Sequence, residues 1–248
     1  MSIEIAGVRV DNLDMKGVVS EIEKRIEVND KSKIYTPNLD FLYNASKSGE
    51  FKRILNDSDL NIPDGKPLIW LSRLNGESLK EKVAGSDLFI ELCKLSNLKG
   101  YRIFILGAEE GVPDKAIKNL TNTYGDINCV GFYSPPFGFE KNIETLESII
   151  SKINSTKPDI LFVALGSPKQ EFFIDKYFKR LNSIVSIGVG ASIDFAAGVK
   201  SKPPHFVKEI GMAWLWRALS EPKRLGIRYL KNITFFIKYL TSVMLNKM

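Results

Sequence analysis

Short apolar runs alternate with amphipathic segments along most of the chain. Four runs are short and apolar enough to form strands: 101–107, 127–133, 159–166 and 183–189. A run as uniformly apolar as 159–166 is typical of a parallel sheet that is covered on both faces. Between the runs, apolar residues recur every three or four positions, which is the spacing of an amphipathic helix. Strands and helices that alternate in this way predict a doubly wound α/β sheet, with 159–166 at its centre.

The segment from Ile34 to Gly65 predicts one βαβ unit of this sheet. Each end is a strand-like run that stops at a proline, and the interval between them has helical spacing with Gly49 as its weak point. A crossover of this length makes the two strands parallel, so Thr36, Asn38 and Asp64 should emerge at the same edge. Ligands bind at that edge in open α/β sheets. In a purely structural alternative, these residues only cap a helix or form a turn.

The remaining segments complete the predicted organisation. Residues 2–12 fit a hairpin or an edge strand. Helices are expected over 13–28, 67–74, 86–98 (with Ser86 as its N-cap), 113–124 and 140–154, and from 167–171 onward. Pro203-Pro204 marks a boundary, after which helices are expected at about 206–219 and from Pro222 onward. We therefore divide the chain into an α/β catalytic domain, residues 1–198, and a helical appendage, residues 199–248.

Charge separates the same two parts. The chain has a net charge of +6, but residues 199–248 alone carry +8 and the body is mildly acidic. On a helical wheel, one face of the last helix carries Arg224, Arg228, Lys231 and Lys238, and the opposite face carries Leu225, Tyr229, Ile233, Phe236, Leu240 and Val243. This pattern is typical of a helix that lies in an anionic membrane interface. The alternative is that the apolar face packs on the body.

The scarcity of histidine and cysteine excludes several kinds of chemistry. One histidine, His205, cannot build a histidine-rich metal site, and Cys93 and Cys129 indicate a reducing compartment without a disulfide framework. Any general base is therefore expected to be a carboxylate. The motif Asp57-Ser-Asp59 imitates a metal-binding Asp-x-Asp, but it precedes its strand and should lie at the wrong edge of the sheet. We expect metal-independent chemistry with Lys and Arg as the cations, and no other cofactor.

Five loops should meet at the ligand edge, because each follows a predicted strand. They are Thr36–Asn38, Pro63–Gly65, Gly107–Ala108, Gly166–Gln170 and Gly190–Asp194. The loop at Gly166–Gln170 opens a helix, whose free N–H groups and positive dipole end favour a phosphate. There is no Walker A loop, and Gly188-Val-Gly190 is only a fragment of a dinucleotide fingerprint. The set predicts a pocket for a nucleotide or a sugar phosphate.

Several motifs, in order over nearly the whole chain, resemble the WecG/TagA/CpsF glycosyltransferase family. They are Thr36-Pro-Asn-Leu-Asp40, Pro63-Asp-Gly65, Val83-Ala-Gly-Ser-Asp87, Gly166-Ser-Pro-Lys-Gln-Glu171, Gly188-Val-Gly-Ala191, Trp214-x-x-Arg217 and Glu221-Pro222-x-Arg224. The resemblance implies an inverting transfer of a sugar from a UDP-sugar onto a polyprenyl-diphosphate-linked sugar, at the cytoplasmic face of the cell membrane. In the TagA branch, N-acetylmannosamine is moved onto lipid-linked N-acetylglucosamine for wall teichoic acid.

The resemblance also implies roles for residues of the body. Asp64 matches the catalytic base of the family. Thr36, Asn38 and Gln170 match residues that bind the phosphates and the sugar of the donor, and Asp194 matches a nucleoside contact. In chemical terms, an inverting transfer is one displacement that needs a base for the acceptor hydroxyl and positive charge at the departing diphosphate.

The matches in the appendage and in one loop are less regular. Arg217 and Arg224 match arginines of the family's C-terminal appendage, which closes over the active site at the membrane. Arg228 matches a third arginine only approximately, and Lys82 stands where the family has an arginine. Lysine keeps the charge but loses the bidentate fork, so a different donor, such as another UDP-hexose or a UDP-uronic acid for exopolysaccharide, remains an alternative.

Two other classes of protein compete with this interpretation. A nucleotide-dependent oxidoreductase would need a complete dinucleotide fingerprint and would not explain the basic appendage. A non-catalytic module at the membrane would leave the placement of Asp64 and Gln170 unexplained. We expect no nucleic acid among the partners.

Overall fold

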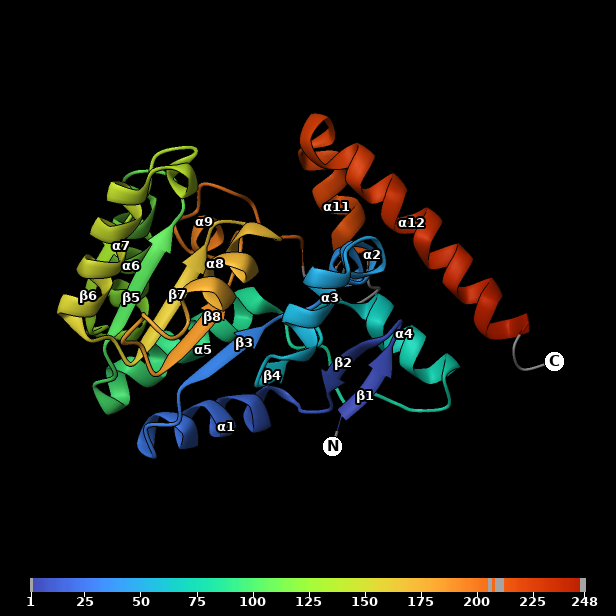
Figure 1. Cartoon of the computed structure of the whole chain (residues 1–248), viewed down its shortest axis with the longest axis horizontal. Coiled ribbons are helices and arrows are strands. Elements are labelled where there is room, and N and C mark those ends of the chain that lie inside the picture. Colours follow the sequence, from blue (N-terminus) through green and yellow to red (C-terminus); the bar gives the residue numbers. More distant parts are fainter. Residues whose placement is uncertain (1, 205–206, 208–211, 246–248) are drawn as a thin grey trace.

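The computed structural model of the chain describes residues 2–204, 207 and 212–245, without the side chains of residues 213, 214, 217, 223, 224 and 244. Its core is a six-stranded parallel sheet in the order β4-β3-β8-β7-β5-β6 (Figure 1). The strands are β3 (Ser32–Tyr35), β4 (Leu60–Asn61), β5 (Ile103–Gly107), β6 (Cys129–Tyr133), β7 (Ile160–Ala164) and β8 (Val185–Gly188). The predicted parallel α/β sheet is confirmed, and β7 is one of its two central strands.

Helices cover both faces of the sheet (Figure 1). One face packs against α1 (Met15–Glu27), α5 (Gly85–Lys99), α6 (Val112–Tyr124) and α9 (Ser192–Ala196). The core on the other side includes α2 (Leu39–Lys47), α3 (Gly49–Asn56), α4 (Lys66–Leu74), α7 (Ile143–Thr156) and α8 (Lys169–Tyr177), with a 3₁₀ turn at Phe139–Lys141. Side chains of each strand alternate between the two cores, as the period of two requires: Ile103 and Ile105 lie in one, and Phe104 and Leu106 in the other.

The βαβ unit at 34–65 has the predicted form, with one break. Strands β3 and β4 are parallel, and Ile34 pairs with Leu60. The helical interval is interrupted next to the predicted weak point, because Ser48 ends α2 and its hydroxyl caps α3 by accepting the N–H of Phe51 at 3.2 Å. A serine at an N-cap accepts a backbone N–H of the first helical turn that would otherwise have no hydrogen-bond acceptor in the helix.

Two other local predictions have different outcomes. The N-terminal hairpin is confirmed as β1 (Ser2–Ile5) and β2 (Val8–Asp11), which are antiparallel. The assignment of Ser86 as a helix cap is wrong, because Ala84 is the N-cap of α5 and its carbonyl accepts the N–H groups of Asp87 and Leu88. Ser86 therefore lies inside the first turn.

The appendage packs on the body. It forms α11 (Ala213–Ser220) and α12 (Pro222–Leu245), which lie beside α2, α4 and the hairpin in Figure 1. The ring of Phe235 contacts Tyr43 and that of Phe236 contacts Trp70, with centroids 6.1 and 6.4 Å apart. The hydroxyl of Tyr239 accepts the backbone N–H of Ala6 at 3.1 Å. Part of the predicted helix at 206–219 falls outside the described residues.

The prediction that the apolar face of α12 lies in a membrane interface is therefore partly wrong. Leu225 is buried and Phe236 packs on the apolar core, so this face contributes to the interface with the body. The physical reason is that Trp70 and Tyr43 offer an apolar surface within the same chain. Of the predicted face, Ile233 is exposed, and the other exposed large apolar side chains of α12 lie outside that face: Ile227 (69% exposed), Leu230 (66%), Ile237 (53%) and Leu245.

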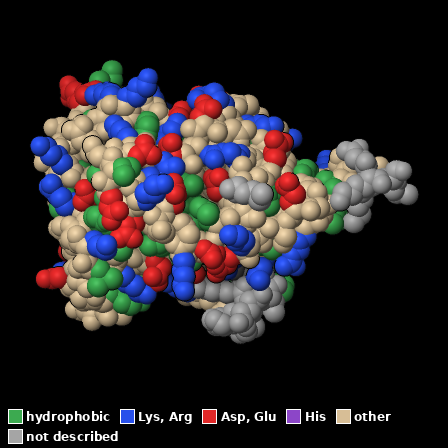
Figure 2. Space-filling model, turned by 90° about the horizontal axis from the view of Figure 1, so that it is seen from below, with side chains coloured by type: hydrophobic (Ala, Val, Ile, Leu, Met, Phe, Trp, Pro, Cys, Tyr) green, Lys and Arg blue, Asp and Glu red, His purple; other side chains and the backbone are tan. Residues whose placement is uncertain are grey.

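The hydropathy of the helices and the distribution of surface charge bear on contact with a membrane. Of the helices in the described part of the chain, none combines the length and the hydropathy that a membrane span requires. Figure 2 shows a face of the molecule on which basic and acidic side chains are interspersed.

Candidate active site

Backbone hydrogen bonds tie three loops together at the carboxyl edge of the sheet. The N–H of Asp64 donates to the carbonyl of Pro37 at 2.9 Å, and the N–H of Val83 donates to the carbonyl of Pro63 at 2.9 Å. The loop of Lys82 therefore joins those of Thr36 and Asp64, because it is anchored directly to the segment that precedes Asp64. Lys82 itself is half-buried.

Thr36 and Asn38 use part of their hydrogen-bonding capacity inside the protein. The buried Thr36 hydroxyl donates to the carbonyl of Gly188 on β8 at 3.4 Å. Asn38 caps α2, since its Oδ1 accepts the N–H groups of Asp40 at 3.0 Å and of Phe41 at 3.4 Å. The alternative role of Asn38 as a helix cap is therefore present in the structure. Its side-chain NH₂ group is the part that can still bind a ligand.

The start of α8 places two consecutive polar side chains in the interior of this edge. Gln170 is 3% exposed and Glu171 is fully buried. The Gln170 Nε2 donates to Glu171 Oε1 at 2.7 Å, and the Gln170 Oε1 accepts the N–H of Gly190 at 3.0 Å. Burial raises the pKa of the Glu171 carboxyl to about 7, and the hydrogen bond from Gln170 acts in the opposite direction.

A cleft of about 340 Å³ opens beside these residues. It is lined by the ends of β5 and β7, by residues 135–140, and by Lys169, Asp194 and Lys200. The carboxylate of Asp194 accepts a hydrogen bond from Lys200 Nζ at 2.7 Å. The volume lies at the lower end of the range for small-molecule sites, and the mixture of apolar walls with a few charges is usual for them.

The appendage reaches the same edge through Asp40, which follows the Asn38 cap by two residues. Arg228 of α12 forms an ion pair with the nearly buried Asp40 at 2.5 Å, and Asn232 Nδ2 donates to its other oxygen at 3.2 Å. Arg228 is thus used in docking α12 on α2. The side chains of Arg217 and Arg224 lie outside the described part of the structure.

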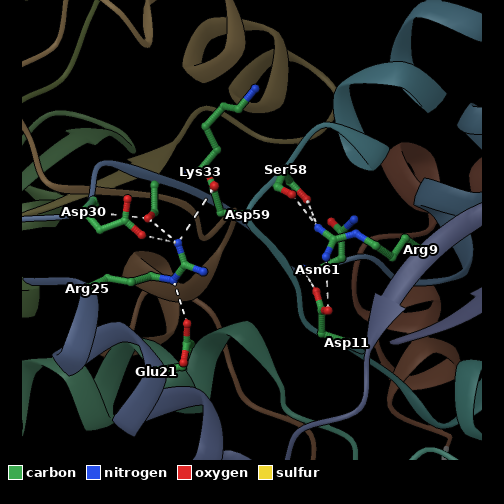
Figure 3. A network of polar contacts seen from close by, with 10 residues as sticks. Arg9, Asp11, Glu21, Arg25, Asp30, Lys33, Ser58, Asp59 and Asn61 are labelled. Carbon is green, nitrogen blue, oxygen red and sulfur yellow. Dashed lines mark hydrogen bonds and ion pairs between the residues drawn. The ribbon is translucent and has the colours of Figure 1, made fainter. Parts of the chain in front are cut away.

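Asp59 lies at the opposite edge of the sheet, as its position before β4 predicts. Its Oδ2 accepts the N–H of Lys33 at 2.7 Å, and its Oδ1 lies 3.9 Å from Arg25 (Figure 3). Arg25 also pairs with Glu21 and Asp30, each at 3.0 Å. Within residues 2–204, 207 and 212–245, no three His, Cys, Asp or Glu side chains are grouped so that they could hold a metal ion.

The sequence did not single out three of the charged residues at this edge: Glu171, Asp40 and Lys200. Asp40 and Glu171 belong to motifs that match the family. Glu171 also precedes the apolar run Phe172-Phe173-Ile174, and a lone carboxylate at the start of such a run is a signal that could have found it. The partners of Asp40 on α12 are 188 and 192 positions away in the sequence, so no local pattern could identify them.

The fold is that of the doubly wound α/β proteins, a class in which ligands bind at the carboxyl ends of the strands. The family model described as "Glycosyl transferase WecG/TagA/CpsF family" matches residues 3–247. The chain belongs to this family and is a glycosyltransferase.

Curated relatives have one name in common, N-acetylglucosaminyldiphosphoundecaprenol N-acetyl-beta-D-mannosaminyltransferase. The protein of Bacillus subtilis (strain 168) is 30% identical over 86% of this chain and 81% of its own length. The protein of Bacillus spizizenii is 29% identical over 93% and 86%, and that of Staphylococcus aureus (strain MW2) is 27% identical over 95% and 90%. The similarity thus extends over nearly all of both chains.

Proposed function

We propose that this glycosyltransferase moves N-acetylmannosamine, with inversion, from UDP-N-acetylmannosamine onto polyprenyl-diphosphate-linked N-acetylglucosamine. The names of the relatives support the acceptor and the transferred sugar. The observation that carries the proposal is the position of Asp64, whose loop is hydrogen-bonded to the Thr36–Asn38 loop at the carboxyl edge of the sheet. Such a product fits the synthesis of a cell-wall polymer such as wall teichoic acid.

Asp64 acts as the general base in this proposal. It accepts the proton of the acceptor hydroxyl while that oxygen attacks the anomeric carbon and the bond to UDP breaks. A positioned base contributes about 10²–10⁴-fold to the rate. The one histidine of the chain lies in the Lys-Pro-Pro-His segment of the appendage, so a carboxylate is the available base in the body.

The donor is held along the same edge. Thr36, Asn38 and Gln170 bind its sugar and phosphates. The first N–H groups of α8 and the charge of Lys82 favour the diphosphate. Fixed positive groups of this kind stabilise the departing diphosphate most strongly when its charge develops, which makes a metal ion dispensable.

Asp194 contacts the nucleoside in this proposal. Its ion pair with Lys200 holds the carboxylate in the wall of the cleft, where it can accept hydrogen bonds from a ribose or a base. The cleft also brings the Lys169 ammonium over the ring of Phe137, 4.9 Å from the centroid.

Residues 199–248 act as a separate appendage that binds the cytoplasmic face of the membrane and completes the site. On α12, the outward face has apolar Leu230, Ile233 and Ile237 on one side and Lys231 and Lys238 on the other. An amphipathic helix with such an outer face binds an anionic interface, and each basic group near that surface contributes about 1 kcal/mol. Arg217 and Arg224 then bring positive charge towards the lipid diphosphate, while Arg228 holds α12 on the body through its ion pair with Asp40.

The test is a transfer assay with a panel of donors. UDP-N-acetylmannosamine, UDP-N-acetylglucosamine, UDP-glucose and UDP-glucuronic acid are each incubated with the protein and a short-chain lipid-diphosphate N-acetylglucosamine, and products are identified by mass spectrometry. We expect a lipid-linked disaccharide and free UDP with UDP-N-acetylmannosamine. Transfer from UDP-glucuronic acid or UDP-glucose alone would overturn the donor assignment, and NAD(P) binding without UDP-sugar turnover would overturn the proposed reaction.

A further inference from the structure

The Gln170 side chain is held at both ends of its amide group. A backbone N–H can only donate, so the contact of 3.0 Å with Gly190 identifies the Gln170 atom that faces it as the oxygen. The nitrogen then faces Glu171 Oε1, at 2.7 Å. The two contacts together fix which way the amide is turned. They leave one N–H and one lone pair of the amide for another partner.

The backbone of β8 closes around the same pair of side chains. A Cβ atom at Gly188 would lie 2.7 Å from Gln170 Nε2 and 3.1 Å from Glu171 Oε1, so no larger residue fits there without displacing them. The carbonyl of Gly188 accepts the Thr36 hydroxyl, which connects this pair to the other donor-binding loop. Gln170, Glu171 and Thr36 therefore form one packed unit.

The burial of Glu171 destabilises the fold more than a purely structural role for this residue would require. It is fully buried, and the groups that hydrogen-bond its carboxyl are the neutral Gln170 amide and the Ser167 hydroxyl. Burying a carboxyl group beside neutral partners costs more free energy than burying an apolar side chain of similar size. A methionine or leucine would fill the same space without this penalty, so packing alone does not account for a carboxyl group here.

We propose that Glu171 is a positioning residue that orients the Gln170 amide, so that the remaining N–H and oxygen of the amide face the donor sugar. This inference rests on the assignment of Gln170 to donor binding in the proposed function. Glu171 itself does not touch the donor. Its effect on catalysis passes through the hydrogen bond to Gln170 Nε2.

The test compares Glu171→Met, which removes the acceptor, with Glu171→Gln, which keeps an oxygen acceptor of the same length. With UDP-N-acetylmannosamine and the short-chain acceptor at pH 8, where Glu171 is ionised, Glu171→Met should raise the donor KM roughly tenfold to a hundredfold, the range for loss of one hydrogen bond to a charged group. The acceptor KM and the dissociation constant of UDP should change less than about twofold. Glu171→Gln should recover most of the loss, which a role in packing alone would not predict.

A double variant tests whether Glu171 acts through the Gln170 amide, because it removes that amide as well. Gln170→Ala/Glu171→Met should be no worse than Gln170→Ala, because Glu171 has nothing left to orient. Additive losses, or equal donor KM values for Glu171→Met and Glu171→Gln, would overturn the inference. If Gln170→Ala keeps the wild-type donor KM while transfer proceeds, the role of Gln170 and this inference both fail, but the proposed reaction stands.

A second measurement does not depend on the donor. In NMR spectra of the full chain, the two Nε2 protons of Gln170 should have dispersed, sharp signals in the wild type and in Glu171→Gln. In Glu171→Met they should move towards the positions of a freely rotating glutamine. Unchanged signals in Glu171→Met would overturn the positioning role even if the donor proves to be a different UDP-sugar.

Discussion

At the amino edge of the sheet, Arg25 lies among three carboxylates, whereas at the carboxyl edge Glu171 is buried against the Gln170 amide. The contacts at the amino edge satisfy one another: Arg25 also donates to Ser32 Oγ, and Asp59 accepts the N–H of Lys33 (Figure 3). At the carboxyl edge, by contrast, Glu171 is fully buried and hydrogen-bonds to neutral groups, the Gln170 amide and the Ser167 hydroxyl.

This difference separates charges that hold the fold together from groups that are arranged for a ligand. Networks of paired charges need no further partner, whereas a buried carboxyl group with a raised pKa beside a cleft is a candidate member of a functional site. The appendage contacts the carboxyl edge, since Arg228 and Asn232 reach Asp40 beside the Asn38 cap.

The largest effect is expected from one aspartate at each edge. Asp64→Asn should lower the transfer rate by about 10²–10⁴-fold, the contribution of a general base, while UDP binding is retained. Asp59→Asn keeps an oxygen for the N–H of Lys33, so it should retain wild-type transfer and lose about 1 kcal/mol of stability or less. Steady-state kinetics and urea unfolding measure the two effects. Asp64→Asn with more than a tenth of the wild-type rate, or inactive Asp59→Asn, would break the contrast.

The second comparison separates charge at the site from charge at the membrane. Arg217→Ala/Arg224→Ala should reduce transfer by at least about a hundredfold, as is usual when groups that stabilise developing charge are removed, and should still bind anionic vesicles. Lys231→Ala/Lys238→Ala should show the reverse: weaker vesicle binding, but normal transfer to a water-soluble acceptor. Vesicle sedimentation and a soluble-acceptor assay provide the two measurements. Normal transfer by the arginine variant would reduce the appendage to an anchor.

A smaller effect concerns the stability of the carboxyl edge. The folded-state pKa of Glu171, about 7, lies above the unfolded value of about 4.3, so the folded protein retains a proton that the unfolded chain loses. The stability of the wild type should therefore fall as pH rises from about 4.5 to 7. Glu171→Gln lacks this titration and should gain about 3 kcal/mol relative to the wild type between these pH values.

The measurement for this prediction is urea unfolding of both proteins at pH 5, 6, 7 and 8. Other groups titrate equally in the two proteins, so the difference isolates Glu171. A difference that does not change with pH would show that Glu171 has an ordinary pKa in the folded protein.

The smallest effect is expected from removal of divalent ions. The Asp-x-Asp motif contains Asp59, which is engaged at the amino edge, and the proposed cations at the carboxyl edge are Lys and Arg. Transfer should therefore keep its rate, within about twofold, when EDTA is added and Mg²⁺ and Mn²⁺ are omitted. A strict requirement for either ion, restored by its addition, would show that the cation assignment is wrong.

Much of the body was predictable because its signals are local. Proline and glycine after each apolar run mark the strand ends, and these ends place Thr36, Asp64 and Gln170 at one edge once the sheet is parallel. The same reasoning placed Asp59 at the opposite edge. Even the interruption near Gly49 could be anticipated, because glycine weakens a helix interior.

The parts that could not be predicted depend on contacts across the chain. The wheel of α12 shows an apolar face but not its partner, and the structure covers Phe236 with Trp70 of α4. The sequence predicts that Arg228 binds a phosphate, but in the structure it forms an ion pair with Asp40. The burial of Glu171 follows from the approach of β8 at Gly188, which depends on the order of the strands.

The central claim is that the donor binds at the carboxyl edge of the sheet, and titration of the ¹⁵N-labelled protein with UDP tests it most directly. The account predicts that the backbone amide signals of Thr36, Gln170 and Gly190 shift in proportion to bound UDP, while those of Lys33 and Asp59 stay in place. Shifts centred on Lys33 and Asp59, with the carboxyl edge unchanged at saturating UDP, would contradict it.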